Sequence, residues 1–232
     1  MAKNKLKPKY IVGLDKAGRA SPSKHHYVIG IDEAGRGPLA GRISVAAVLL
    51  SAKEHHLVKN GIKEGKKYIP LRDSKKLSSI QREIWFRWIK KQKIAHAASF
   101  VSSRKIDKIN VSQACNLAAR KSVEKLIKKN KKIKATLVAD GGINLNFKIN
   151  KFSFISFPKA DERVPAVALA SIVAKVLRDR EMRRLHKRYP QYGLSDHKGY
   201  GTKKHILAIK KHGPSPIHRL TFIRKYHKIK NI

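Results

Sequence analysis

Short apolar runs, rich in β-branched and aliphatic residues, recur along the chain and predict the strands of a sheet. The first covers Tyr27 to Ile31, and the longest, Arg42 to Leu50, is continuous enough to suit a central strand. Three further runs cover residues 94–101, 135–139 and 152–157, of which the last predicts an edge strand. We therefore expect these five segments to be extended.

Apolar residues at helical spacing predict four helices, at Ser78–Lys90, Ser112–Lys128, Val164–Arg188 and Thr202–Lys211. In the first of them, Trp85 and Trp88 are expected to lie in the core and not to stack on bases. Residues 51–70 are rich in lysine and glycine and predict a loop. Residues 189–205 interleave aromatic, glycine and basic residues, which favours an irregular nucleic-acid-contacting surface over a core.

Two carboxylates and a glycine-rich turn follow the first strand. Asp32 and Glu33 are adjacent, and the run from Gly35 to Pro38 can continue neither a strand nor a helix. Adjacent acids repel each other unless a cation or a proton lies between them. The turn exposes N–H groups around one guanidinium, so it could hold a phosphate beside a metal bound by the acids. The alternative is an ordinary polar turn at the end of a strand.

Two further acids stand at positions that suit a metal site. Asp140 ends the strand at 135–139 and is followed by two glycines, and Asp161 lies just ahead of the helix that begins near Val164. Glu162 is a competing candidate for the second position. Asp179 lies inside that helix between two arginines, and a helical ion pair explains it better than metal binding.

The motifs around these acids resemble those of the type 2 ribonucleases H, and most closely the ribonuclease HII branch. The resemblance rests on GIDEAGRGPLAG from residue 30, DSKKL from residue 73, Asp-Gly at residue 140, ALASIVAKVLRDR from residue 168 and HKGYGT from residue 197. It extends over about Tyr27 to Phe222, and the Gly-Arg-Gly turn favours this branch over ribonuclease HIII. Arg42, where the family usually has proline, and Ala160, where it has glycine, depart from the pattern.

The resemblance implies an α/β, RNase H-like fold with a mixed central sheet flanked by helices and a helical C-terminal extension. It also implies three parts: a basic, flexible arm at residues 1–26, a catalytic domain at 27–188 and a substrate-contacting extension at 189–232. Inside the arm, Tyr10 to Pro22 is a degenerate copy of the first motif that lacks the glutamate and the glycine turn.

By the same resemblance, the sheet brings together Asp32, Glu33, Asp140 and Asp161 as catalytic metal ligands. Oxygen ligands alone suit Mg²⁺ or Mn²⁺ better than zinc. The implied activity is a metal-dependent endoribonuclease that hydrolyses the RNA strand of RNA–DNA hybrids. It would also cut on the 5′ side of single ribonucleotides in duplex DNA and leave 5′-phosphate and 3′-hydroxyl ends.

Substrate recognition is expected from the remaining motifs. Gly35, Arg36 and Gly37 are candidates for reading the ribose 2′-hydroxyl, the group that distinguishes RNA from DNA. The Tyr200 ring is expected to stack on the sugar of the next deoxynucleotide. Ser74 and Lys75 suit a phosphate contact ahead of a helix, although a helix cap with solvated lysines is nearly as good an explanation.

Charge and cysteine content agree with a nucleic-acid partner. The 232 residues suit one domain, and 54 basic against 15 acidic residues give a formal net charge of +39, which favours a polyanion, either nucleic acid or an anionic membrane surface. The sequence has no apolar run long enough to span a bilayer and no visible signal peptide. Cys115 is the single cysteine, which excludes a disulfide framework and indicates a cytoplasmic protein, by default a monomer.

Two other functional classes share parts of this pattern. A non-catalytic basic nucleic-acid-binding protein could keep the scaffold, but it would not need all four acids. A structure-selective DNA nuclease on the same fold would share the acids, yet it would not need the Gly-Arg-Gly turn and Tyr200. The ribonuclease interpretation is therefore favoured.

Overall fold

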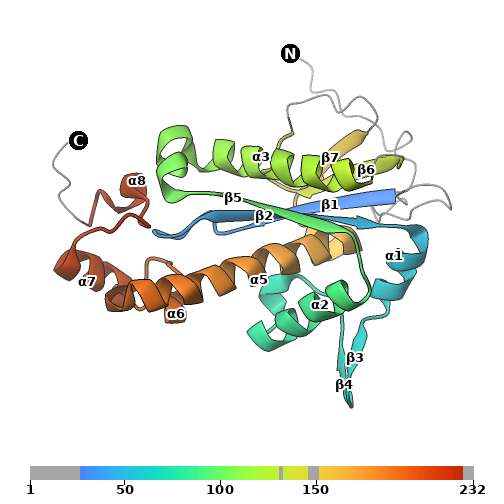
Figure 1. The fold of residues 1–232 in the computed structure, drawn as a ribbon, viewed down its shortest axis with the longest axis horizontal. Helices are drawn as coiled ribbons and strands as arrows, with labels where there is room; N and C mark the ends of the chain where they lie inside the picture. The colour runs from blue at the N-terminus through green and yellow to red at the C-terminus, as the bar shows by residue number, and fades with distance from the viewer. Residues whose placement is uncertain (1–26, 131–132, 146–151, 227–232) are drawn as a thin grey trace.

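A mixed five-stranded sheet forms the centre of the molecule in the computed structural model, which describes residues 27–130, 133–145 and 152–226. The strands are β1 (Tyr27–Ala34), β2 (Ile43–Leu50), β5 (His96–Val101), β6 (Ala135–Asp140) and β7 (Ser153–Phe157). Their order is β5-β2-β1-β6-β7; β1 pairs antiparallel with β2 and parallel with β6. The strand of the first motif therefore lies in the middle of the sheet (Figure 1).

Helices cover both faces of this sheet, which explains why the central strands read as continuous apolar runs. One face packs against α3 (Ser103–Lys129), and the other against α5 (Pro165–Arg188), with α1 (Ala52–Lys59) and α2 (Ser79–Lys91) beside it (Figure 1). A methyl group added at Gly30 of β1 would lie 2.0 Å from the backbone carbon of Ala166. Only glycine permits α5 to approach the central strand this closely.

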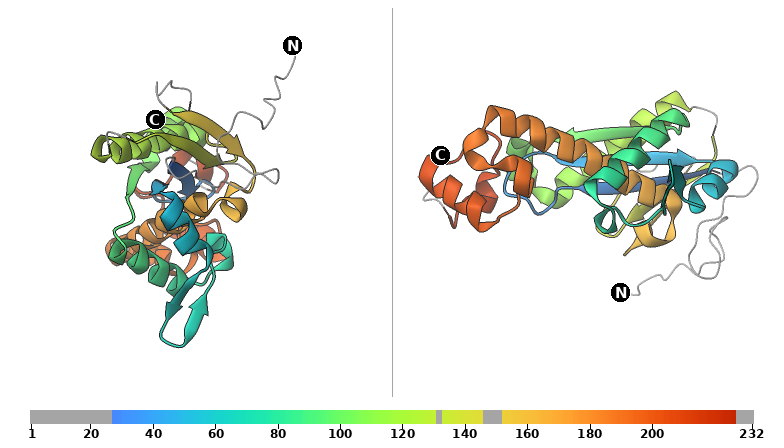
Figure 2. Two further views of the ribbon diagram at one scale, coloured as in Figure 1. Left: turned by 90° about the vertical axis from the view of Figure 1, so that its right-hand side faces the viewer. Right: turned by 90° about the horizontal axis from the view of Figure 1, so that it is seen from below.

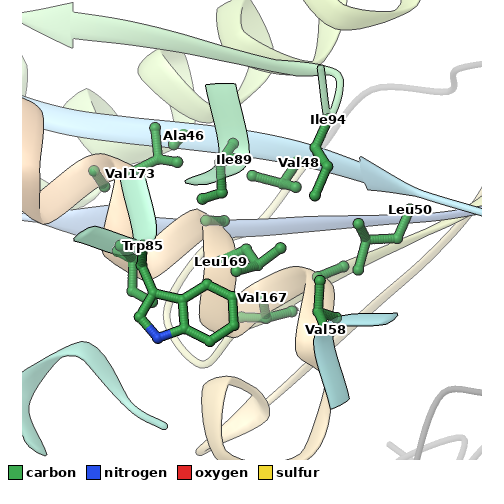
Figure 3. Packing of buried hydrophobic residues seen from close by; sticks show 14 of the residues in the cluster. Ala46, Val48, Leu50, Val58, Trp85, Ile89, Ile94, Val167, Leu169 and Val173 are labelled. Atoms are coloured by element: carbon green, nitrogen blue, oxygen red, sulfur yellow. The ribbon is translucent and has the colours of Figure 1, made fainter. Parts of the chain in front are cut away.

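The larger core cluster lies between the sheet and α5. Figure 3 shows β2 side chains meeting Leu169 and Val173 of α5, with Trp85 and Ile89 of α2 closing the layer. Trp85 is fully buried, and Trp88 packs against the same cluster, so the prediction that both tryptophans belong to the core is confirmed. This layer holds α5 rigidly behind the acid-bearing end of β1.

The C-terminal extension forms a small cluster of its own at one end of the molecule (Figure 2). Its elements are η3 (Pro190–Tyr192), α6 (Leu194–His197), α7 (Lys203–His212) and α8 (Leu220–Ile223). Its buried side chains share one cluster with Leu39 and Ala40, which follow the glycine turn; they are Tyr192, Leu194, Ile209 and Ile223. The extension is therefore packed onto the first motif.

Three local predictions were wrong. Strand β1 continues through Asp32 and Glu33 to Ala34, because these residues pair with β2; the acids lie within the strand and not after it. Residues 51–70 hold α1 and the hairpin β3 (Ile62–Glu64)–β4 (Lys67–Ile69), which projects from the body (Figure 1). Residues 189–205 are partly core, since Tyr192 and Leu194 fill the C-terminal cluster.

Helix α3 begins earlier than the expected residue 112, with a kink at Asn110, whose φ of 62° is non-helical. The Asn110 side chain accepts a hydrogen bond from the Gln113 N–H at 3.0 Å, so it caps the second half of the helix. The predicted helix corresponds to this second half. The predicted α/β architecture is confirmed, whereas the expected arm at residues 1–26 lies outside the described residues. No helix in the described part of the chain is long and apolar enough to cross a bilayer.

Candidate active site

The side chains of Asp32 and Glu33 point to opposite faces of the sheet near the end of β1, because side chains alternate along a strand. Asp32 is buried on the α5 side, where the Ser171 hydroxyl hydrogen-bonds its carboxylate. Glu33 is partly buried on the α3 side, where its Oε1 accepts a hydrogen bond from Arg36 Nη1 at 3.2 Å. The end of the central strand thus places one carboxylate on the α5 side of the sheet and one on the α3 side.

Asp140 and Asp161 reach this point from the neighbouring strand and from a short helix. Asp140 ends β6, which is parallel to β1, and its Oδ1 accepts a hydrogen bond from the Ala160 N–H at 2.9 Å. That bond fixes the start of α4 (Ala160–Arg163), in which Asp161 is buried. Ala160 is itself fully buried, so a methyl group fits where the family usually has glycine.

The carboxylates influence one another's protonation. Burial, followed by the charge of Glu33, raises the pKa of Asp32 well above its usual range. Burial also raises the pKa of Glu33, against the opposing effect of Arg36. Burial, Asp73 and Asp140 together raise the pKa of Asp161 to about 6. These five acids therefore share one electrostatic environment that favours protons or a cation.

The donor set fits a hard divalent cation. All candidate ligands are carboxylate oxygens, and Glu33 Oε2 is a buried oxygen without a hydrogen-bond partner. Among the described residues, however, no group of three or more acidic, histidine or cysteine side chains is placed so that it could hold a metal ion by itself. Mg²⁺ commonly keeps waters and is held by one or two carboxylates plus substrate phosphates. The arrangement suits an ion whose coordination the substrate completes.

The Gly-Arg-Gly turn lies directly beside the acids. Arg36 reaches across it, donating from Nη1 to Glu33 and to the Gly142 carbonyl at 3.3 Å, and from Nη2 to the Ser112 hydroxyl at 3.4 Å. A methyl group at Gly142, whose φ is +97°, would lie 2.8 Å from Arg36 Nη1. The second glycine after Asp140 is therefore needed to make room for Arg36.

Two buried arginines hold the turn from behind, and the sequence interpretation missed both. Arg219, from the start of α8, donates to the carbonyls of Gly35, Arg36 and Gly41. Arg178, from α5, donates to the carbonyls of Ala40 and Lys198 at 3.2 and 3.0 Å and also to that of Arg42. Burial and the neighbouring Arg178 lower the pKa of Arg219 to about 9. Only their position in family-like stretches could have drawn attention to them.

Tyr200 lies over the same turn. A methyl group added at Gly37 would lie 3.9 Å from its ring, which is van der Waals contact, and the tyrosine is 44 % exposed. The Tyr200 carbonyl is hydrogen-bonded to His205 Nδ1 at 2.9 Å, and His205 Nε2 lies 3.2 Å from His218 Nε2. His205 therefore contacts the backbone of Tyr200 and holds this segment in position.

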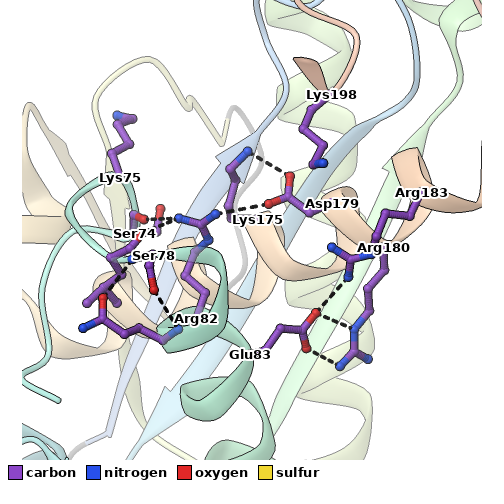
Figure 4. A network of polar contacts seen from close by, with 12 residues as sticks. Ser74, Lys75, Ser78, Arg82, Glu83, Lys175, Asp179, Arg180, Arg183 and Lys198 are labelled. Carbon is purple, nitrogen blue, oxygen red and sulfur yellow. Dashed lines mark hydrogen bonds and ion pairs between the residues drawn. The ribbon is translucent and has the colours of Figure 1, made fainter. Parts of the chain in front are cut away.

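The segment from Asp73 to Leu77 packs against α5 through a polar network (Figure 4). Arg82 of α2 donates to the carbonyls of Ser74 and Leu77 and pairs with Asp179 of α5 at 3.3 Å. The Lys75 side chain extends away from this network in Figure 4. Partial burial lowers its pKa, but Asp73, Asp161, Asp32 and Asp140 raise it overall, which places the ammonium group near the acids.

Ser74 is buried, and its hydroxyl lies 2.7 Å from that of Ser171, the residue that also contacts Asp32. Asp73 caps the η2 turn (Ser74–Lys76) by accepting the Lys75 N–H at 2.9 Å, and it hydrogen-bonds Asp161. The sequence interpretation overlooked Asp73 as a neighbour of the acid cluster. Its place in the DSKKL motif was the available signal.

The competing acids have other partners. Glu162 is exposed and pairs with Lys76 at 2.8 Å. Asp179 pairs with Arg82 and with Lys175 at 2.9 Å, one helical turn back, so the expected ion pair is present with different partners from the adjacent arginines. Arg42, at the position where the resemblance leads us to expect proline, forms an ion pair with Glu181 at 2.5 Å.

Two depressions border this region. One, of about 760 Å³, runs along α3 and is lined by Lys105, Lys108 and several amide side chains, among them Asn144. The other, of about 590 Å³, reaches Asp161 and is flanked by Arg163. Only the second contains one of the four candidate acids, and its basic side chains beside Asp161 suit a polyanion passing over it.

Comparison with known proteins places these features in one family. A family model described as "Ribonuclease HII" matches residues 29–227. The chain is 45 % identical over 215 residues to a ribonuclease HII of Endomicrobium trichonymphae, covering 91 % of this chain and 84 % of the relative. It is 40 % identical over 217 residues to a ribonuclease HII of Caldicellulosiruptor bescii, covering 93 % and 87 %.

Solved structures show the same architecture. The chain resembles ribonuclease H2 of Pyrococcus horikoshii with a TM-score of 0.65 at 26 % identity, covering 87 % of this chain and 97 % of that one. It also resembles the ribonuclease HII of Archaeoglobus fulgidus, solved in complex with PCNA, with a TM-score of 0.61 at 25 % identity, covering 84 % and 94 %. A ribonuclease HIII solved with Mn²⁺ shares the fold, with a TM-score of 0.65 at 18 % identity. The match covers 87 % of this chain and 68 % of that one.

Proposed function

The chain belongs to the ribonuclease HII family, and from this premise we propose how its residues carry out the reaction. It is a hydrolytic endonuclease that acts on the RNA strand of RNA–DNA hybrids. A non-catalytic scaffold is thereby set aside. The finer proposal is that it also cuts on the 5′ side of a single ribonucleotide in duplex DNA, leaving 5′-phosphate and 3′-hydroxyl ends. The approach of Tyr200 to Gly37 beside the acids carries this proposal.

Asp32, Glu33, Asp140 and Asp161 are the proposed metal ligands, and Mg²⁺ or Mn²⁺ the proposed cofactor. When bound, such an ion would neutralise the phosphate and supply an activated water. The protein contributes the placement of three carboxylates on two parallel strands and of Asp161 in α4, together with the raised pKa of the buried acids. Because these acids repel one another, cation binding relieves an unfavourable state of the free protein.

The turn and Tyr200 are the proposed readers of the ribonucleotide. Gly35, Arg36 and Gly37 would contact the ribose 2′-hydroxyl, while the Tyr200 ring stacks on the sugar of the next deoxynucleotide. Support comes from the half-exposed ring lying directly over Gly37, so that one sugar could touch both. Only the 2′-hydroxyl distinguishes the two kinds of nucleotide at one position.

Ser74 and Lys75 are proposed to act on the substrate backbone in different ways. Lys75 extends toward the acids and would contact a phosphate there. Ser74 is buried and bonded to Ser171, so its contribution would come through its backbone or through the position of Asp32. Lys75→Ala should therefore weaken substrate binding and its salt dependence, whereas Ser74→Ala should not alter the salt dependence.

Cleavage of a duplex that holds one ribonucleotide tests the proposal. The purified protein is incubated with this duplex and with an all-DNA control, in Mg²⁺, Mn²⁺ or EDTA, beside Asp140→Asn. We expect metal-dependent cutting only on the 5′ side of the ribonucleotide, lost in the variant. Cutting of hybrids without cutting of this duplex would refute the finer proposal and leave the family activity untouched.

A further inference from the structure

Arg219 is a fully buried arginine whose guanidinium ends on backbone carbonyls of the glycine turn. Nη2 donates to the Gly35 oxygen at 2.6 Å, and Nη1 donates to the Arg36 oxygen at 2.7 Å. Nε and Nη2 both reach the Gly41 oxygen, at 3.1 and 3.0 Å. No ion pair in the described part of the chain involves Arg219. Its donors therefore serve the turn's backbone.

These contacts determine where the N–H groups of the turn point. In a trans peptide, the C=O and the N–H of the same unit point in opposite directions, and the described residues contain no cis peptide. Because the Gly35 and Arg36 oxygens face Arg219, the N–H groups of Arg36 and Gly37 face away from it. Neither of these N–H groups has an acceptor among the described residues. They are two aligned donors available to a ligand.

The same stretch of chain ties the turn to the Tyr200 segment. The Arg219 N–H donates to the Leu39 carbonyl at 2.8 Å, and the Leu39 N–H donates to the Gly199 carbonyl at 2.8 Å. The Gly41 N–H donates to the Ile217 carbonyl at 2.8 Å. The two free N–H groups and the Tyr200 ring are thus held in one rigid unit, with Arg219 at its back.

We propose that Arg219 is a positioning residue for ribonucleotide recognition, which aims the Arg36 and Gly37 N–H groups at the ribose 2′-hydroxyl by holding the carbonyls of the same peptide units. The inference rests on the proposed function of the turn as the reader of that hydroxyl. A planar fork of five donors can satisfy three carbonyls at once. The single ammonium of a lysine keeps the charge but cannot span them.

Binding measured on two matched duplexes tests this role. On an Asp140→Asn background, which should prevent cutting, the dissociation constants for a duplex with one ribonucleotide and for the all-DNA duplex are compared by fluorescence anisotropy. The protein with Arg219 should prefer the ribonucleotide. In Arg219→Lys that preference should fall about fivefold or more, while the affinity for all-DNA duplex stays unchanged, because Arg219 is buried behind the turn.

A matched variant separates positioning from general loss of structure. Tyr192→Phe keeps the ring in the C-terminal cluster and removes only a 2.8 Å hydrogen bond from the hydroxyl to the Gly213 carbonyl, which is not part of the turn. Its ribonucleotide preference should equal that of the parent. If Arg219→Lys does not fold, Arg219→Gln, which buries no charge, replaces it with the same expected loss.

Each outcome decides a different question. An unchanged preference in folded Arg219→Lys or Arg219→Gln would overturn the inference about Arg219. An equal loss in Tyr192→Phe would overturn it as well, since any weakening of the extension would then suffice. The absence of any ribonucleotide preference in the parent protein would instead overturn the proposed function of the turn, and the inference with it.

Discussion

The two halves of the candidate active site are built in opposite ways. The acid half keeps several carboxylates close together, with raised pKa values and a buried Glu33 oxygen that has no partner. The turn half, in contrast, has its carbonyls satisfied by Arg219 and Arg178. The acid half is completed by what binds to it, whereas the backbone of the turn half is already held in place by contacts within the protein. On the proposed function, the site would combine adaptable metal coordination with rigid reading of a sugar.

Removing one acid should have the largest effect on cleavage. Asp32→Asn keeps the shape but removes a charge that we propose binds the metal, and losing even an outer neighbour of a metal ligand typically costs 10–100-fold. We expect the single-turnover cleavage rate to fall by at least about 100-fold in saturating Mg²⁺, with substrate affinity nearly retained. A rate within tenfold of the parent would show that Asp32 is not a ligand.

Removing the support of the turn altogether should also lower stability. Arg219→Ala leaves the carbonyls of Gly35, Arg36 and Gly41 buried without donors. The free energy of unfolding in urea should fall by about 2 to 4 kcal/mol, while Arg180→Ala, at an exposed pair with Glu83, should change it by less than about 1 kcal/mol. Equal effects of the two variants would contradict the described role of Arg219 in the fold.

Tyr200 should contribute to recognition through its ring and not through its hydroxyl. We expect Tyr200→Phe to cleave a duplex with a single ribonucleotide almost as well as the parent, and Tyr200→Ala to lose about tenfold in kcat/KM, as stacking contributions of this kind suggest. As a control, both variants are compared on a hybrid of one continuous RNA strand and one DNA strand. Equal activity of Tyr200→Ala on the single ribonucleotide would remove this role.

The smallest expected effect is a gain of stability in the acid half. The raised pKa of Asp161, about 6, means that the folded protein binds more protons than the unfolded chain between about pH 4 and 6. Stability from this group is therefore present at low pH and lost as the pH rises through 6. In EDTA at pH 7.5, Asp161→Asn should be more stable than the parent by about 1 kcal/mol, after allowance for solvent screening. At pH 4 the two proteins should have the same free energy of unfolding. If Asp161→Asn were more stable by the same amount at pH 4 and pH 7.5, the proposed repulsion of the ionised Asp161 by the neighbouring acids would be contradicted.

Much of this architecture could be predicted from the sequence, because apolar runs and helical spacing report burial directly. The central strands and α5 follow from such patterns, and the acids follow from their motifs. The hairpin at 62–69 was missed because its strands are short, lysine-rich and largely exposed. Strand β1 was expected to end too early because acidic residues disfavour strands, and pairing with β2 overrides that preference.

The supporting residues of the site were harder to predict for a different reason. An arginine in a basic chain is expected on the surface, and nothing local distinguishes Arg219 or Arg178 from the other basic residues. Their roles depend on carbonyls that lie far away in the sequence. Asp73 was similarly treated as part of a phosphate motif, although its side chain bonds Asp161.

The hydrogen bond between Arg219 and Gly35 joins residues that are 184 positions apart. A contact between such distant residues forms late, because the loop it closes must first be ordered by the rest of the fold. The sheet and its acids need only the segments up to α5. During folding, the acid cluster should therefore form before the contacts between Arg219 and the turn, so the proposed recognition of the ribonucleotide would be the last property to form.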